Sequence, residues 1–285
     1  MTTRDGSRPA ERASAADSAP TAKAAPAVPA AHTRQTGYRQ HRFTPPPGSC
    51  EILLVRHGES QPAYPGSPFP LADGRADPGL APEGAGQAER VAQRLAGRRI
   101  DAIYVTSLRR TLQTARPLAR RLGLVPNVER GLREVGLGDW ESIFRQKVAE
   151  NGPLAQRMWA EGRWDVIPGA ESAAEFAARV RGGIERIAAA HPDQRVAVFT
   201  HGGVIGQAMA LASGSRVFAF IGADNGSVSH LVMGNGQWII RGFNDTAHLE
   251  PAFSPQATAI RPDLQRSACR GPDSRQDKSP RRRNS

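Results

Sequence analysis

The chain has 285 residues, and 39% of them are apolar, somewhat less than in an average globular protein. Its net charge of +11 lies mostly at the ends, since residues 1–48 and 249–285 contribute +4 each and the segment between them only +3. This distribution allows weak, salt-sensitive contact with polyanions but predicts no specific nucleic-acid partner. No run approaches the roughly 18 apolar residues that span a bilayer, and no signal peptide is evident, so we expect a cytoplasmic protein without membrane attachment.

Composition divides the chain into three parts. Residues 1–48 and 249–285 contain few branched apolar or aromatic side chains, so they could not bury enough surface to offset the entropy of ordering them. We predict two disordered tails, the second of them basic, with partner-binding arms as the alternative. Residues 49–248 then form one domain of roughly 200 residues. The only cysteines, Cys50 and Cys269, are too few and too far apart for a disulfide framework or a zinc cluster.

Short apolar runs alternate with segments of helical periodicity along this domain. The runs predicted to form buried strands are residues 51–55, 101–105 and 196–200. The segments predicted to form helices are residues 85–95, 112–122 and 176–187. Ser172 and Glu175 form a capping box before the third helix, and residues 227–233 and 237–243 flank a Gly-Asn-Gly turn as a hairpin. The order predicts an α/β fold, a three-layer α/β/α sandwich whose mostly parallel central sheet has an antiparallel edge.

Histidines and arginines come shortly after the three predicted strands. Arg56 and His57 follow the first strand directly, and His201, with Gly202 next to it, follows the third. Arg109 and Arg110 follow the second strand after Thr106-Ser-Leu108. Because ligands of such sheets bind at the carboxyl ends of the strands, we expect these side chains to share one site. Glycines allow close approach of the backbone, and the helix that begins after His201 presents the positive end of its dipole to an anion.

This set of side chains suits phosphoryl transfer. Arginine offers a bidentate fork to phosphate, and a neutral imidazole is a competent nucleophile. A second, protonated imidazole can donate to the phosphoryl oxygens, and a carboxylic acid can protonate the leaving alkoxide. Each residue alone has an ordinary alternative, since a histidine after a strand is more often structural and an arginine pair is usually a solvated helix face.

Several segments resemble, in order, the motifs of the histidine phosphatase superfamily, which includes the cofactor-dependent phosphoglycerate mutases. Leu54-Val-Arg-His-Gly-Glu-Ser60 is similar to its signature. Ser107-Leu-Arg-Arg-Thr-Leu-Gln-Thr-Ala115 resembles its arginine motif, which selects Arg110 over Arg109. Residues 132–141 resemble the stretch that supplies an acid, here Glu134. The other similar segments are residues 77–87, 168–172 and 200–203.

The resemblance implies a mechanism without a cofactor. We expect no metal ion either, because no cluster of carboxylates or of His and Cys residues has ligand spacing. His57 would accept the phosphoryl group as a phosphohistidine, and Glu134 would protonate the departing oxygen and then activate water or another acceptor. The groups implied to hold the phosphate are Arg56, Arg110, His201 and Gly202. The partner would be a small phosphorylated metabolite, and the oligomeric state is left open, with a homodimer among the alternatives.

Departures from the mutases favour a phosphatase. Gln61-Pro-Ala-Tyr64 stands where mutases usually have Trp-Asn, and Ser142 replaces a common glycine. The leading prediction is therefore a phosphatase that hydrolyses small phosphomonoesters. The alternatives are a cofactor-dependent phosphoglycerate mutase and a non-catalytic phosphate-binding regulatory protein.

Two further predictions concern the surroundings of the site. Residues 140–170 are expected to form a helical cover over it, with ordinary core packing of their tryptophans as the alternative. Those tryptophans are Trp140, Trp159 and Trp164. Glu59 and Glu171 are expected to support loops by hydrogen bonds, with a role as a second acid as the alternative.

Overall fold

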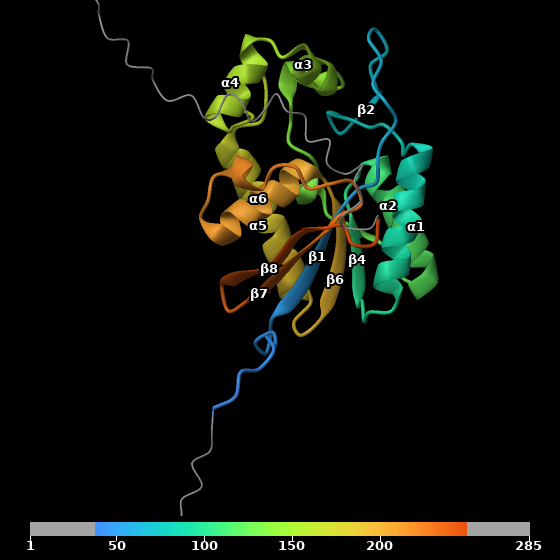
Figure 1. The fold of residues 1–285 in the computed structure, drawn as a ribbon, viewed down its shortest axis with the longest axis vertical. Coiled ribbons are helices and arrows are strands. Elements are labelled where there is room, and N and C mark those ends of the chain that lie inside the picture. The colour runs from blue at the N-terminus through green and yellow to red at the C-terminus, as the bar shows by residue number, and fades with distance from the viewer. Residues whose placement is uncertain (1–37, 250–285) are drawn as a thin grey trace, which may run out of the picture. The chain divides into compact units, whose positions relative to one another are not determined.

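The six strands of the main sheet lie in the order β5-β4-β6-β1-β7-β8 (Figure 1). They belong to a computed structural model, which describes residues 38–249 of the chain. In chain order the strands are β1 (Cys50–Arg56), β4 (Ala102–Val105), β5 (Asn127–Val128), β6 (Arg195–Thr200), β7 (Val228–Gly234) and β8 (Gln237–Asp245). The pairs among β1, β4, β5 and β6 are parallel, whereas β7 is antiparallel to both of its neighbours. The predicted parallel sheet with an antiparallel edge is confirmed.

Strand β1 is buried on both faces, because successive side chains of a strand point to opposite sides. Ile52 and Leu54 pack into one core with α5 and α6, while Leu53 and Val55 pack into another with α1 and α2. These helices are α1 (Pro82–Ala96), α2 (Arg109–Leu122), α5 (Ala173–Ala190) and α6 (Gly202–Ser213). Helices therefore cover both faces of the sheet, as predicted for a three-layer sandwich (Figure 1).

The start of α5 shows the predicted capping box. The Ser172 hydroxyl accepts a hydrogen bond from the Glu175 N–H at 3.2 Å, and the Glu175 carboxylate accepts one from the Ser172 N–H at 3.2 Å. The two orphan donors at this helix end are thus satisfied reciprocally. The cap fixes where α5 begins, and with it the position of the residues that precede it.

Several short elements lie beyond the carboxyl ends of the central strands, at the top of Figure 1. They are the two-stranded sheet of β2 (Leu71–Ala72) and β3 (Arg75–Ala76), and the helices α3 (Phe144–Glu150) and α4 (Pro153–Glu161). Three 3-10 turns complete the fold: Arg130–Leu132, Gly138–Trp140 and Val217–Phe220. The predicted helical segment at 140–170 is therefore two short helices.

The domain boundaries remain a prediction, because the predicted tails at 1–48 and 249–285 lie largely outside the described residues. Before β1, the Ser49 N–H donates to the Pro46 carbonyl at 3.1 Å, and the Gly48 N–H donates to the Asp193 carboxylate at 2.6 Å.

Within residues 38–249, no helix has the length and apolar character needed to cross a membrane. Burial raises the pKa of the Cys50 thiol to about 12, so this cysteine is chemically inert at neutral pH.

Candidate active site

Two histidines follow adjacent parallel strands. The register of β1 and β6 places Arg56 beside Thr200, so that the next residues, His57 and His201, leave the sheet side by side. Their ring centroids lie 5.2 Å apart with the ring planes at 62°. His57 is 5% exposed and His201 is fully buried. The structure thus brings together the two histidines that the sequence places at separate strand ends.

The hydrogen bond of the His57 ring identifies its basic nitrogen. Its Nδ1 lies 2.8 Å from the Gly58 carbonyl oxygen, which can only accept, so Nδ1 carries the proton and Nε2 holds the lone pair. Burial, followed by the charges of Arg110 and Arg56, lowers the pKa of His57 well below its usual value. At neutral pH this imidazole is therefore neutral and has Nε2 as its nucleophilic atom.

Two arginines lie beside His57, and each has N–H donors that its hydrogen bonds to the described residues do not use. The Arg56 guanidinium donates through Nη1 to the Ala223 carbonyl, whereas its buried Nε has no hydrogen-bond partner among the described residues. Arg110 is 7% exposed and donates through Nη1 to the Ala76 carbonyl at 2.9 Å. Burial lowers the pKa of both guanidinium groups, but arginine remains charged in proteins. Each arginine can therefore donate to a bound anion.

Glu134 reaches the site from the loop after the first 3-10 turn. Its carboxylate accepts from the Val135 N–H at 3.0 Å and from the Gly203 N–H in the first turn of α6 at 3.3 Å. A Cβ at position 203 would lie 2.5 Å from the Glu134 Oε1 atom, so glycine leaves the room that this carboxylate occupies. The start of α6 thus accommodates the Glu134 carboxyl group and holds it by a hydrogen bond.

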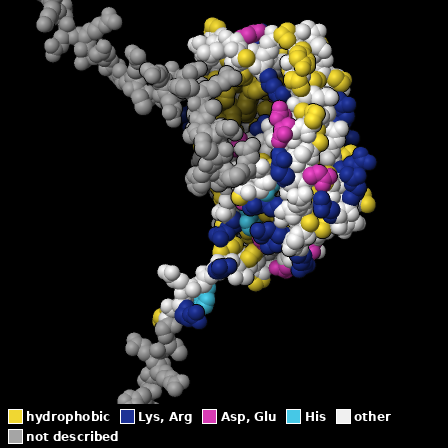
Figure 2. Space-filling model, turned by 45° about the vertical axis from the view of Figure 1, so that its right-hand side comes forward, with side chains coloured by type: hydrophobic (Ala, Val, Ile, Leu, Met, Phe, Trp, Pro, Cys, Tyr) yellow, Lys and Arg dark blue, Asp and Glu magenta, His cyan; other side chains and the backbone are white. Residues whose placement is uncertain are grey.

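Four of the residues predicted for the site line one cavity of about 340 Å³: Arg56, His57, Arg110 and Glu134. Aromatic and aliphatic side chains, Phe69, Phe144 and Trp164 among them, form another part of the wall. Figure 2 shows a hollow in the upper part of the visible face, with hydrophobic side chains inside it and charged side chains along its edge. A cavity of this size suits a small-molecule ligand.

His201 and Gly202 do not belong to the cavity lining. The His201 Nε2 lies 3.1 Å from the Thr106 hydroxyl oxygen, and its Nδ1 has no hydrogen-bond partner within the described part of the chain. Burial and the nearby cations, Arg110 first, lower the pKa of His201 well below its usual value. The surroundings thus favour the neutral ring, in contrast to the protonated one expected from the sequence, because burial and then the nearby arginines disfavour its positive charge.

Arg145 is a cavity residue that the sequence did not reveal. It comes from α3, lines the cavity, and donates to the Ser60 hydroxyl at 2.8 Å and to the Gln61 carbonyl at 3.3 Å. Its charge also contributes to the lowered pKa of His57. No motif marks this position, because Arg145 is one of many charged residues between Trp140 and Trp164.

The predicted cover and supports are confirmed only in part. Trp164 lines the cavity, but Trp140 is buried in the core, and Trp159 packs its ring against Phe218. Glu171 supports a loop by accepting from the Gly136 N–H at 3.1 Å. The prediction for the Glu59 side chain is wrong: it is exposed and makes no hydrogen bond to the described residues, and only its main chain holds the loop.

Metal ligands were not expected from the sequence. In the part of the chain that the structure describes, no three His, Cys, Asp or Glu residues cluster so as to hold a metal ion. The positive charge beside His57 comes from arginines instead. Independence of metal ions stays a prediction, to be tested by turnover in the presence of a chelator.

The fold and this cluster define an α/β sandwich with histidine, arginine and glutamate side chains gathered at its carboxyl strand ends. Residues 52–246 match the histidine phosphatase superfamily (branch 1), and the chain belongs to this family, as predicted. It is thus an enzyme of the histidine phosphatase type. Phosphoglycerate mutase-like protein 4 of Arabidopsis thaliana is 34% identical over 208 residues, which are 70% of this chain and 87% of that protein.

Two further relatives are named as phosphatases. Phosphoserine phosphatase 1 of Hydrogenobacter thermophilus is 32% identical over 74% of this chain and 99% of its own length. Among solved structures, the mycobacterial glucosyl-3-phosphoglycerate phosphatase is similar with a TM-score of 0.59 and 28% identity, over 70% of this chain and all of that one. These relatives are similar along nearly the whole described domain.

Proposed function

We propose that the protein hydrolyses small phosphomonoesters through a phosphohistidine at Nε2 of His57. One observation carries the proposal. His57 lines the cavity as a neutral imidazole whose Nδ1 proton is bonded to the Gly58 carbonyl, which leaves Nε2 as the nucleophile. Arg56 and Arg110 line the same cavity and supply the fork-shaped donors that phosphate oxygens require.

The reaction has two displacements at phosphorus. In the first, His57 Nε2 forms the P–N bond while the bond to the leaving oxygen breaks, and Glu134 gives that oxygen a proton. In the second, the Glu134 carboxylate takes a proton from water, the water oxygen attacks phosphorus, and the P–N bond breaks to release inorganic phosphate. Arg56 and Arg110 stabilise the charge on the equatorial oxygens in both steps. Negative charge on the phosphoryl group would also raise the pKa of the neighbouring His201.

We propose further that the substrate carries a carboxylate in addition to its phosphate. Arg145 provides a third guanidinium on the cavity wall, on α3 rather than next to the strand ends that carry Arg56 and Arg110. The names of two relatives give their substrates as phosphoserine and glucosyl-3-phosphoglycerate, and both of these compounds combine a phosphate with a carboxylate. A guanidinium beyond the phosphate site is suited to bind this second anionic group.

A phosphoglycerate mutase reaction is the second candidate, because one similar protein is named mutase-like. Both reactions would share the phosphohistidine, and they differ in whether water or a second hydroxyl group accepts the phosphoryl group. Product analysis separates them: a phosphatase releases inorganic phosphate from phosphoserine and phosphoglycerate, whereas a mutase returns an isomeric phosphoglycerate.

The test of the proposed function is to trap the intermediate. The protein is mixed with phosphoserine, quenched in alkali, and analysed by peptide mass spectrometry. We expect phosphate on His57 in the wild type, and neither phosphate nor turnover in His57→Asn. Phosphate on another residue, or nearly full activity of His57→Asn, would show that His57 is not the nucleophile.

A further inference from the structure

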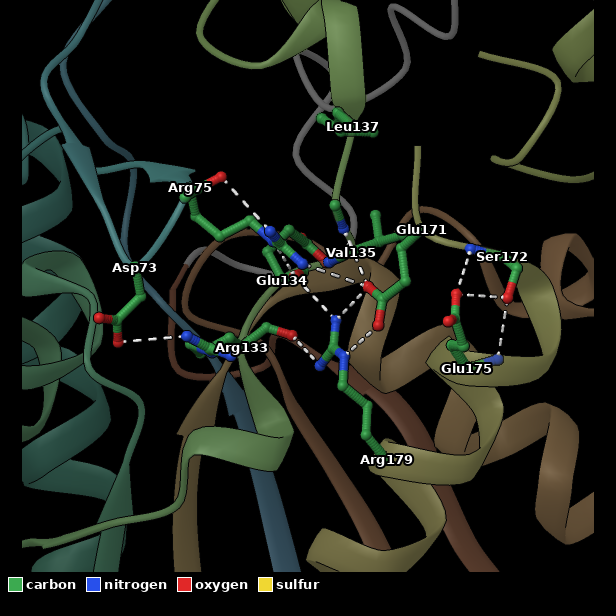
Figure 3. Close-up of polar contacts among 12 residues, drawn as sticks. Asp73, Arg75, Arg133, Glu134, Val135, Leu137, Glu171, Ser172, Glu175 and Arg179 are labelled. Atoms are coloured by element: carbon green, nitrogen blue, oxygen red, sulfur yellow. Dashed lines mark hydrogen bonds and ion pairs between the residues drawn. The ribbon is translucent and has the colours of Figure 1, made fainter. Parts of the chain in front are cut away.

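The main-chain carbonyl of Glu134 accepts hydrogen bonds from two arginines (Figure 3). Arg75 of β3 donates from Nε at 3.1 Å, and Arg179 of α5 donates from Nη2 at 2.9 Å. These arginines lie 59 and 45 residues away along the chain. The carboxylate of the same residue is bonded at the start of α6. Glu134 is therefore held at both its main chain and its side chain, by three different elements.

Arg179 also fixes the residues that lead to Glu134. Its Nη1 donates to the Gly131 carbonyl at 2.8 Å and to the Arg133 carbonyl at 2.6 Å. One guanidinium thus binds three carbonyls of the segment 131–134, and its planar geometry allows little variation in how they lie. This segment has no regular secondary structure beyond its 3-10 turn. Hydrogen bonds from the Arg179 side chain therefore hold it, in place of the backbone hydrogen bonds that a strand would make.

Glu171 joins the two arginines. Its carboxylate accepts from Arg179 at 2.5 and 2.7 Å, from Arg75 at 3.4 Å, and from the Gly136 N–H at 3.1 Å. Burial alone would raise the pKa of Glu171, but the hydrogen bonds from Arg179 and Gly136 lower it, so the carboxylate remains ionised. Its charge stabilises two partly buried guanidinium groups in one arrangement, and Figure 3 shows the three side chains around the Glu134 main chain.

Arg75 links this arrangement to the hairpin at the rim of the site. At the turn between β2 and β3, Asp73 accepts from the Ser107 hydroxyl at 2.8 Å and forms ion pairs with Arg130 and with Arg133, the latter at 3.2 Å. The hairpin is thus tied at its turn and through Arg75 to the segment that carries Glu134. A displacement of the hairpin would displace the carbonyl of Glu134.

We propose that Arg75, Arg179 and Glu171 form a clamp that positions Glu134 for proton transfer to the leaving oxygen. The inference rests on the proposed function, since it assigns the clamp to one step of that reaction. None of the three residues lines the cavity, so they are positioning residues rather than catalytic ones. Proton transfer requires the acid within hydrogen-bond reach of the leaving oxygen, and a misplacement of about 1 Å can cost on the order of 10²-fold in rate.

The experiment compares two leaving groups in Arg75→Gln and Arg179→Gln. Phosphoserine has an alkoxide leaving group that needs a proton, whereas nitrophenyl phosphate has one that leaves readily without it. We expect kcat/KM for phosphoserine to fall roughly 10- to 10²-fold and kcat/KM for nitrophenyl phosphate to fall much less. Glu134→Gln gives the reference, with a selective loss on the order of 10²–10⁴-fold for the alkyl ester.

Arg186→Gln is the matched control. Arg186 lies on the same helix as Arg179 and pairs with Glu129 at 2.8 Å, just before the same segment, without contact to the Glu134 carbonyl. We expect it to leave the ratio of the two substrates unchanged. Arg75 lies in a two-residue strand outside both cores, so Arg75→Gln carries the test if Arg179→Gln unfolds at assay temperature.

Three outcomes would overturn the clamp. Equal losses for both substrates in Arg75→Gln would mean that the arginine supports the fold or the phosphate site. An unchanged ratio in both clamp variants would mean that Glu134 needs no positioning. The same selective loss in Arg186→Gln would mean that any damage to this segment produces it. Absence of phosphate release from either substrate by the wild-type enzyme is a different result, which would refute the proposed function and the clamp with it.

Discussion

Burial sets the chemistry of the two histidines at the site. The pKa values of His57 and His201 are both lowered, first by desolvation and then by Arg110 and other nearby cations. A histidine in the unfolded chain has a pKa of about 6.5, so at mildly acidic pH the unfolded state binds protons that the native state does not. The neutral form suits a nucleophile, and it makes the stability of the protein sensitive to acid.

We therefore expect the free energy of unfolding to fall as pH drops below about 6.5, by up to about 1.36 kcal/mol per pH unit for each such histidine. The loss begins as the unfolded state is protonated and ends only below the native pKa. Urea unfolding between about pH 5 and 7 measures the slope. His57→Asn removes one of these groups and should make the dependence of the unfolding free energy on pH shallower. Part of that dependence should remain, because the pKa of His230 is also lowered. An unchanged slope in His57→Asn would show that the pKa of His57 is not lowered in the native state.

At the scale of elements, α3 sets the position of Arg145 on the cavity wall. If Arg145 binds the carboxylate of the substrate, its removal should matter only for substrates that have one. Phosphoserine and phosphoethanolamine differ in that group alone. We expect Arg145→Met to lower kcat/KM for phosphoserine about 10-fold or more, the loss of one charge-assisted hydrogen bond, and to leave phosphoethanolamine nearly unchanged. Steady-state assays of phosphate release give both values.

Lys147→Met provides the control for charge and helix stability. Lys147 lies on the same helix and pairs with Glu150 at 2.9 Å, and it is not part of the cavity lining. Both substrates should be unaffected in this variant. Equal losses for phosphoserine and phosphoethanolamine in Arg145→Met would assign Arg145 to the phosphate or to the loop at Ser60 instead.

The helix α3 also shows which features of the site could not be predicted from the sequence. The strands of the sheet centre and the longer helices could be predicted because their apolar periodicity is local, and Arg56 and His57 were predictable because they follow the first strand. The choice of Arg110 over Arg109 came from the resemblance to a known family. Arg145 could not be predicted: its place depends on the packing of Phe144 against Trp164, at a ring distance of 5.8 Å. The same holds for Arg75, since a two-residue strand has no periodicity to read.

At the scale of the whole molecule, the described residues that line the cavity or form the two hydrophobic cores all lie between Ser49 and Leu249. The segments outside this range carry most of the net charge, +8 of +11, by the counts for residues 1–48 and 249–285. We therefore expect catalysis to depend on the middle segment alone, and contact with polyanions to depend on the ends.

We predict that a chain of residues 44–250 folds and keeps the kcat/KM of the full-length protein. It should begin at residue 44 rather than 49, because the Ser49 N–H and hydroxyl both bond to the Pro46 carbonyl. The measurements are a thermal unfolding curve and phosphate release from phosphoserine, with the full-length protein as control. We expect the same cooperative transition and the same turnover, together with weaker, less salt-dependent retention on a polyanionic matrix, since a segment with a charge of only +2 remains. Loss of the cooperative transition would show that residues outside 44–250 complete the core, and lost turnover with an intact transition would assign them a part in the site.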